Sequence, residues 1–425
     1  MTTSASMPLP APRGSLSHAL ITLLRGAPDG GVRLGGDDLP SLIRLVGIAE
    51  DAAAVTDGPV EDDDVQLSLA LLYELHYRGL DGVDPRWEWQ PQLTAVAAVL
   101  ERVLLAELRD RAAARLAGAA TAEVTAETLP ENLSELIAAD DTPSLSTYLA
   151  RTATSEQYAE FLAHRSVYHL READPHTFAI PRLAGRPKAA LVEVQSDEYG
   201  GGAAERMHSA LFAQTMRTLG VNDRYGAHVD VVPAVTLAWS NAMTLFGLHR
   251  HLRGAVAGHL AVLEMTSSLP NRLYGNGLRR LGFDAEATLF FDEHVEADAV
   301  HEQIAAHDLA AALAADEPAL LPDVLLGAAT ALELDGLVVR HLLDSWAVGG
   351  SSLRGRTAVV RSAAQRGPGE VVQEGPQVAP EVNGAPVSGA VTVPAQAGGA
   401  VDHGRNAQAD HSTVRTARAM RSASR

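Results

Sequence analysis

The stretch FFDEHVEADAVHEQIAAHD, which begins at Phe290, combines a helical composition with metal-binding side chains. An α-helix turns by about 100° per residue, so His294, Asp298 and His301 project from one narrow face. The same stripe carries the apolar residues Phe290 and Ile304, which is typical of an inward-facing helix surface. Imidazoles and a carboxylate are costly to bury without partners, so this face either makes internal hydrogen bonds or binds a metal ion. The alternative is a surface helix whose polar face is solvated.

Carboxylates and a histidine in two other segments could supply further ligands. Glu264 interrupts the apolar run GHLAVLEMTSSLP, where an unpaired ionised side chain would be costly to bury. Glu205 and His208 have the Glu-x-x-His spacing that di-iron bundles use. Glu198 shares a face with Glu205 if one helix runs through both. Each pattern also occurs on solvated helix faces, so the choice between Glu198 and Glu205 stays open.

The segment SVYHLREADPH adds polar groups shortly before a proline that ends its helix. These groups are His169, Glu172, Asp174 and His176. Glu172 lies one turn inside the helix, where a ligand could point into a bundle. Asp174 is interpreted as a terminal residue.

Three consecutive glycines, Gly200 to Gly202, separate Glu198 from His208. Each glycine costs about 1 kcal/mol in a helix interior, so the chain is expected to bend, begin a helix or unwind here. One interpretation is a simple boundary between a loop and a helix. The other is a segment that reshapes as a metal ion binds.

The composition of the 425-residue chain narrows the class of protein. It has no cysteine, which rules out thiolate chemistry and cysteine-held iron–sulfur clusters. A net charge of −19 argues against nucleic acid and anionic membranes as partners. We find no apolar run of membrane-spanning length and no signal-peptide pattern, and therefore expect a cytoplasmic protein.

Helical periodicity dominates the chain and period-2 strand patterns are nearly absent, so the predicted class is all-α. One long helix is expected from Leu237 to Met265, with a break near Gly254. The last segment lacks Leu, Ile, Phe, Tyr and Trp and is expected to be disordered. The predicted organisation is a disordered tail over 1–14, an N-terminal helical region over 15–128, a helical bundle over 129–353 and a disordered tail over 354–425.

Together these motifs resemble the haem-oxygenase-like di-iron oxidases, often called iron-containing redox enzymes. The resemblance covers roughly residues 145–350 and rests on VEVQSDEYGGG, LHRHLRGAVAGHLAVLEMTSS, RRLGF and the histidine helix described above. It implies a haem-oxygenase-like helical bundle with two non-haem iron ions, with manganese as the alternative metal. The ligands that it implies are Glu172, Glu198, His208, Glu264, His294, Asp298 and His301. Asp292 and Glu293 are candidates to orient the ligand imidazoles.

The resemblance also implies an enzyme that activates O2 to oxidise a small organic molecule, by N-oxygenation or by oxidative C–C cleavage. The expected partners are O2 and that substrate, with a homodimer as one option for the assembly. One alternative is a haem-binding or haem-degrading protein of the same fold, although core carboxylates would occupy the space of a porphyrin. Another is a non-catalytic metal-binding bundle. A thiaminase-like hydrolase would need a cysteine nucleophile, which the chain lacks.

Overall fold

A computed structural model of the chain describes residues 6–28, 38–56, 58–119 and 124–355, without the side chains of 38–43 and 296–299. The described residues all lie in one compact unit, Met1–Arg366. They form helices and no strand beyond a single bridge between Met7 and Leu80. The predicted all-α class is therefore confirmed. Among these helices none is long and apolar enough to cross a membrane.

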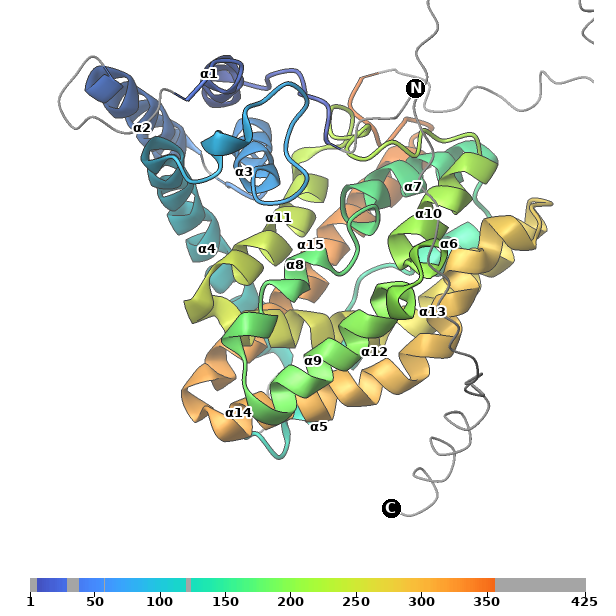
Figure 1. The fold of residues 1–425 in the computed structure, drawn as a ribbon. Helices are drawn as coiled ribbons and strands as arrows, with labels where there is room; N and C mark the ends of the chain where they lie inside the picture. Colours follow the sequence, from blue (N-terminus) through green and yellow to red (C-terminus); the bar gives the residue numbers. More distant parts are fainter. Residues whose placement is uncertain (1–5, 29–37, 57, 120–123, 356–425) are drawn as a thin grey trace, which may run out of the picture. The chain divides into compact units, whose positions relative to one another are not determined.

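The helices follow one another along the chain in the order drawn in Figure 1. The N-terminal ones are α1 (Ser15–Leu24), α2 (Asp38–Val55), α3 (Asp63–Glu74), η1 (Pro85–Trp87), α4 (Pro91–Ala119), α5 (Leu129–Ala138) and α6 (Leu145–Arg151). The middle ones are α7 (Ser155–His169), α8 (Asp174–Thr177), η2 (Ile180–Arg182), α9 (Gly185–Glu198), η3 (Gly200–Gly202), η4 (Ala204–Arg206) and α10 (His208–Thr218). The last ones are α11 (Ala234–Leu248), η5 (Arg250–Leu252), α12 (Arg253–Arg280), α13 (Ala285–Gln303), the π-helix η6 (Ile304–Ala311), α14 (Ala312–Asp316), η7 (Pro318–Leu320) and α15 (Leu321–Ala347).

Side-chain caps fix where several of these helices begin. The side chain of Asp62 accepts hydrogen bonds from the backbone N–H groups of Asp64 and Val65 at the start of α3. Thr154 and Gln157 form a capping box at the start of α7. Each cap satisfies N–H groups that have no partner inside the helix, which sets the first turn.

Helix α12 lies at the centre of the packing and contacts α15, α13 and α6 (Figure 1). Its crossing with α15 is close because both helices place a glycine there. A Cβ added to Gly258 would lie 1.8 Å from the carbonyl oxygen of Val324, and one added to Gly327 would lie 2.0 Å from that of Ala255. The two glycines therefore let the backbones approach to a separation that no larger residue permits.

The N-terminal helices share the hydrophobic core of the bundle. Helix α3 packs on α11, and α4 packs on α15. A buried ion pair between Arg171 and Glu74, with Nη1 and Oε2 3.4 Å apart, also joins the two regions. The regions predicted over 15–128 and 129–353 are thus joined by one continuous cluster of buried apolar side chains.

The described residues extend into both of the predicted tails. Residues 6–14 are placed by specific contacts: Met7 is 4% exposed, and Arg13 donates hydrogen bonds to the carbonyls of Val229 and Val232. At the other end Arg354 pairs with Asp63 at 3.1 Å. Composition does not predict the docking of such short polar segments, because a single buried apolar side chain and a few backbone hydrogen bonds are enough to hold them. Residues 1–5 and 356–425 lie outside the described residues.

The break predicted near Gly254 lies a few residues earlier. Helix α11 ends at Leu248, and α12 starts at Arg253 and continues through Pro270 to Arg280. Gly254 instead sits inside α12, where an added Cβ would lie 3.0 Å from the carbonyl oxygen of Leu320. Close packing, not helix termination, explains this glycine.

Candidate metal centre

Four helices and one interhelical turn bring the predicted ligands together. Glu172 follows the end of α7, Glu198 ends α9 and His208 begins α10, while Glu264 lies inside α12. Helix α13 supplies His294 and His301. All six residues are at least 92% buried, with exposed fractions of 8% for Glu172 and Glu198, 7% for Glu264 and His294, 4% for His208 and 1% for His301. The side chain of Asp298 lies outside the described residues.

The six side chains form two groups that share one carboxylate. Glu172, Glu198, His208 and His294 each offer a ligand atom, and these atoms all lie within 4.8 Å of one another. Glu198, Glu264 and His301 form a second group by the same measure. Glu198 belongs to both groups, so the arrangement is that of two neighbouring sites with a common carboxylate.

The first group holds its imidazoles against carboxylates. His208 Nδ1 lies 2.8 Å from Glu198 Oε2, and His294 Nε2 lies 3.6 Å from Glu172 Oε1. The rings of His208 and His294 are 4.3 Å apart. His294 Nδ1–H donates to the carbonyl oxygen of Phe290 at 2.8 Å, which leaves Nε2 as the lone-pair nitrogen that faces the cluster.

His301 lies between two carboxylates in the second group. Its Nδ1 is 3.5 Å from Glu264 Oε2, and its Nε2–H donates to Asp197 Oδ2 at 3.1 Å. Asp197 therefore fixes the ring orientation and leaves Nδ1 on the side of Glu264. The sequence motifs did not predict a role for Asp197, and the only pattern that could have indicated it is its position directly before Glu198.

Proximity of opposite charges shifts the pKa values of these groups. Burial by itself would raise the pKa of Glu198, but His208 beside it holds the pKa below its usual value. Burial likewise disfavours protonated His301, yet Glu264 and Asp197 raise the pKa of this imidazole to about 9. The protein alone thus balances the buried carboxylates with protons on imidazoles, a role that a metal cation can take over.

Several buried polar atoms in the cluster lack a hydrogen-bond partner among the described residues. They include Glu172 Oε2, while the Nδ1 atoms of His208 and His301 meet neighbouring carboxylates as ion pairs without the geometry of a hydrogen bond. Buried polar groups are normally hydrogen-bonded, so unsatisfied atoms that converge on one place need an explanation. Carboxylate oxygens and imidazole nitrogens are the donor set of Fe(II) and Mn(II), and the residues present therefore fit such ions.

The glycines place the two alternative carboxylates, Glu198 and Glu205, in different surroundings. Gly200, Gly201 and Gly202 have φ of 65°, 61° and 86°, in the left-handed region. They end α9 just after Glu198 and turn the chain, so Glu205 lies exposed in η4 while Glu198 stays buried beside His208. A Cβ on Gly200 would lie 2.6 Å from the carbonyl carbon of Arg206, so this turn requires glycine.

Two further expectations about supporting residues were wrong. Asp292 does not orient an imidazole, because it pairs with Arg279 at 2.5 Å and accepts from Thr288. Glu293 is exposed on the outer side of α13. Residues adjacent to a ligand in sequence point away from it on a helix, since neighbours differ by about 100°.

The other polar residues of the SVYHLREADPH segment line the surroundings of Glu172. His169 Nε2 lies 3.5 Å from Glu172 Oε1, and its ring stacks on Phe212. His176 pairs with His259, with Nε2 and Nδ1 3.3 Å apart, and burial lowers the pKa of His176 to about 4. Asp174 accepts a hydrogen bond from the hydroxyl of Tyr199. None of these three residues belongs to either of the two groups.

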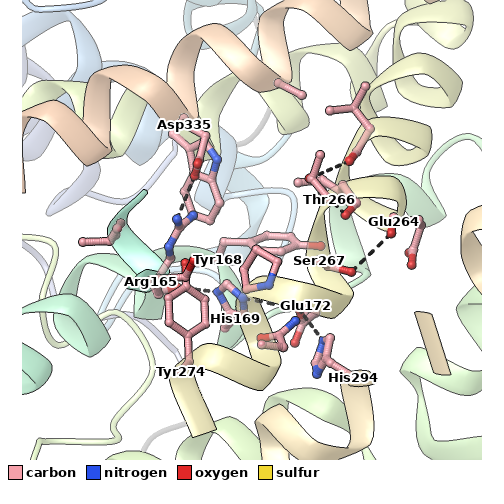
Figure 2. Close-up of a pocket in the computed structure, with 18 of the residues that line it drawn as sticks. Arg165, Tyr168, His169, Glu172, Glu264, Thr266, Ser267, Tyr274, His294 and Asp335 are labelled. Atoms are coloured by element: carbon pink, nitrogen blue, oxygen red, sulfur yellow. Dashed lines mark hydrogen bonds and ion pairs between the residues drawn. The ribbon is translucent and has the colours of Figure 1, made fainter. Parts of the chain in front are cut away.

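A cavity of about 360 Å³ opens onto the cluster (Figure 2). Glu172, Glu198, Glu264 and His294 line it, together with aromatic side chains such as Tyr168, Trp239 and Phe290. This size and mixture of apolar walls with few polar groups is typical of a small-molecule site.

Comparison with known proteins supports the resemblance that the motifs indicated. Residues 159–336 match the family model described as iron-containing redox enzyme. This segment begins in α7, ends in α15 and contains all six clustered residues. The match confirms the family resemblance over these residues and, with the helices of the structure, the haem-oxygenase-like all-α fold. The comparison with curated proteins gives no match.

Proposed function

Because residues 159–336 match the iron-containing redox enzyme family, we propose that the protein binds two iron ions and uses O2 to oxidise a small organic molecule. The observation that carries the proposal is the sharing of Glu198 by two buried ligand groups. One carboxylate within reach of both groups can bridge two cations, as carboxylates do in di-iron bundles.

In this proposal Glu172, His208 and His294 would hold one ion and Glu264 and His301 the other, with Glu198 within reach of both. Asp298, on the same helix as both α13 histidines, joins them by the family pattern. The four carboxylates then balance the charge of two divalent cations, which removes the cost of burying them. Bound ferrous ions supply the electrons for reduction of O2.

The surrounding side chains prepare the cavity for such chemistry. Phe212 and Phe290, both 1% exposed, pack beside His169 and keep that side of the cluster dry. Burial raises the pKa of the Tyr168 hydroxyl well above its usual value, so it stays protonated beside the carboxylates. Tyr168 is thus a neutral hydrogen-bond donor at the cavity wall.

The direct test is anaerobic loading with Fe(II), metal analysis, and then stopped-flow absorbance after exposure to O2. We expect two ions per chain and an absorbance change that follows O2 uptake. A reproducible stoichiometry of one ion or fewer would contradict the two-ion site. His294→Ala should abolish the O2-dependent change while circular dichroism shows a retained helical fold.

The same experiment separates the proposal from its alternatives. A non-catalytic metal-binding bundle would take up iron but would not couple O2 consumption to oxidation of an added organic molecule. A haem protein would show an intense Soret band on titration with haem, whereas a carboxylate-bound iron pair does not. Three buried carboxylates at the end of the cavity favour the metal ions over a porphyrin.

A further inference from the structure

The cavity has a second polar end, formed by an ion pair between α7 and α15. Arg165 Nη2 lies 2.7 Å from Asp335 Oδ1, and both residues line the cavity. In the view of Figure 2 this pair lies at the left, while Glu264 and His294 lie at the right. A molecule in the cavity therefore meets charged groups other than the ligands of the proposed metal centre.

The two members of the pair are not equally available to a ligand. The side chain of Arg165 is 12% exposed and that of Asp335 is 38% exposed. The Arg165 guanidinium lies over the Trp239 ring at 4.7 Å, and Tyr274 also hydrogen-bonds to it. Burial disfavours its charge, but Asp335 and Tyr274 raise the pKa of Arg165, so the cation persists. The buried arginine is thus held behind a more accessible carboxylate.

Because Asp335 is more exposed than Arg165, the pair should bind cationic ligands in preference to anionic ones. A carboxylate ligand would have to displace Asp335 from Arg165, leaving a partly buried aspartate without its counter-ion, which is costly. A protonated amine can instead add to the accessible carboxylate while the ion pair stays intact. Among the described residues that line the cavity, Arg165 is the only arginine or lysine.

We propose that the cavity selects a substrate that carries a protonated amine, which docks on Asp335 while its carbon chain extends toward the metal centre. The inference rests on the proposed function only in taking the bound molecule to be a substrate. Arg165 is then a positioning residue: its ion pair fixes the direction of the Asp335 carboxylate.

The competing explanation is that the ion pair only ties α7 to α15. Such a tie would affect stability but would give the cavity no preference among ligand charges. Charge preference is therefore the quantity to measure, and it can be measured without turnover.

The experiment measures ligand affinities by isothermal titration calorimetry on the full-length protein loaded anaerobically with Fe(II). The three ligands have equal chain length: hexylamine, hexanoate and 1-hexanol. We expect the amine to bind at least ten-fold more tightly than the alcohol. Asp335→Asn should weaken hexylamine binding at least ten-fold and leave the affinity for 1-hexanol unchanged. The same variant should bind hexanoate more tightly, because Arg165 then lacks its counter-ion. Asp335→Glu should retain the amine preference.

A matched control is Asp344→Asn, which removes one carboxylate from the exposed side of the same helix. It should leave all three affinities unchanged. The proposal is overturned if hexanoate is the tightest ligand of the wild type, or if Asp335→Asn leaves amine affinity as it was. If Asp335→Asn does not fold, the order of the three affinities in the wild type and the amine preference of Asp335→Glu still test the proposal. Absent iron binding or O2 uptake would instead overturn the proposed function.

Discussion

At the scale of single residues, Asp197 shows how a group outside the proposed ligand set can control a ligand. Its carboxylate accepts a hydrogen bond from the Nε2–H of His301, and its side chain is 45% exposed. Because the Asp197 carboxylate is half-exposed, its ion pair contributes little stability, and its main effect is on the orientation of the His301 ring. Carboxylates that orient a ligand imidazole typically change metal affinity by about 10–100-fold.

We therefore expect Asp197→Asn to weaken one of the two metal positions by about 10–100-fold and to leave the other unchanged. Calorimetric titration with Mn(II) resolves the two affinities without O2 chemistry. Asp316→Asn, an exposed change at the end of α14, is the control and should leave both affinities unchanged. Equal weakening of both positions in Asp197→Asn would show a general loss of negative charge and not a specific orientation.

His164 illustrates a buried residue that acts on stability and not on the site. Its side chain is 1% exposed, and its two ring nitrogens are hydrogen-bonded to the hydroxyls of Thr236 and Ser352. Burial, with smaller effects of His341 and Arg165, lowers its pKa from the usual 6.5 to about 3. Between these two values the unfolded chain binds a proton that the folded protein does not, so acid favours unfolding.

The contribution of His164 to the free energy of unfolding of the metal-free protein should accordingly be fully present above pH 6.5 and fall as the pH decreases toward 3. His164 contributes a slope of up to about 1.4 kcal/mol per pH unit in that window. His164→Asn should be less stable at pH 7 but should show a shallower decline. Urea unfolding at pH 7, 6, 5 and 4 measures both slopes, and parallel slopes would contradict the assignment.

At the scale of helices, the crossing of α12 and α15 determines the position of the centre. Helix α12 carries Glu264 and also packs on α13, which carries His294 and His301. The separation of α12 from α15 depends on Gly258 and Gly327, whose added Cβ atoms would overlap backbone atoms of the facing helix. Any widening of this crossing moves Glu264 relative to the other ligands.

Gly258→Ala should thus destabilise the fold by about 1–3 kcal/mol, the usual cost of overpacking, and weaken metal binding as α12 shifts. Gly47→Ala is the matched control: Gly47 also lies inside a helix, but nothing stands within 4 Å of its added Cβ. This control should gain about 1 kcal/mol from helix propensity. Thermal midpoints and Mn(II) affinities of both variants test the argument, and equal gains in stability would refute it.

At the scale of the whole molecule, the C-terminal end of the described residues closes onto the bundle. Glu160 on α7 accepts hydrogen bonds from Ser351 Oγ and from both the N–H and Oγ of Ser352. Leu353 is 7% exposed. These contacts tie residues 351–353 to the bundle.

Removal of residues 367–425 is expected to leave the thermal midpoint and Fe(II) stoichiometry unchanged. That segment has no Leu, Ile, Phe, Tyr or Trp and so offers little apolar surface to bury. Truncation after Val348 should instead lower the midpoint clearly, because it also removes Ser351 and Ser352, which donate hydrogen bonds to Glu160. A comparable drop in both truncated proteins would show that the longer segment docks on the bundle.

The sequence by itself determined the fold class and most of the candidate ligands that the structure brings together. Helical periodicity and the absence of alternating strands identify an all-α protein, and the spacing of His294 and His301 places both on one buried face. That inference works because helix geometry is local: residues three or four apart share a face whatever the rest of the chain does. The family resemblance then pointed to Glu172, Glu198, His208 and Glu264, which the structure places with them.

Only the tertiary structure decided which groups face one another across helices. The different burial of Glu198 and Glu205 depends on three glycines with positive φ, whose turn buries the first carboxylate and exposes the second. The pairing of Asp197 with His301 joins residues 104 positions apart in sequence. The Arg165–Asp335 pair likewise joins α7 to α15. Such contacts depend on how whole helices pack, and no local pattern records the relative placement of two distant helix faces.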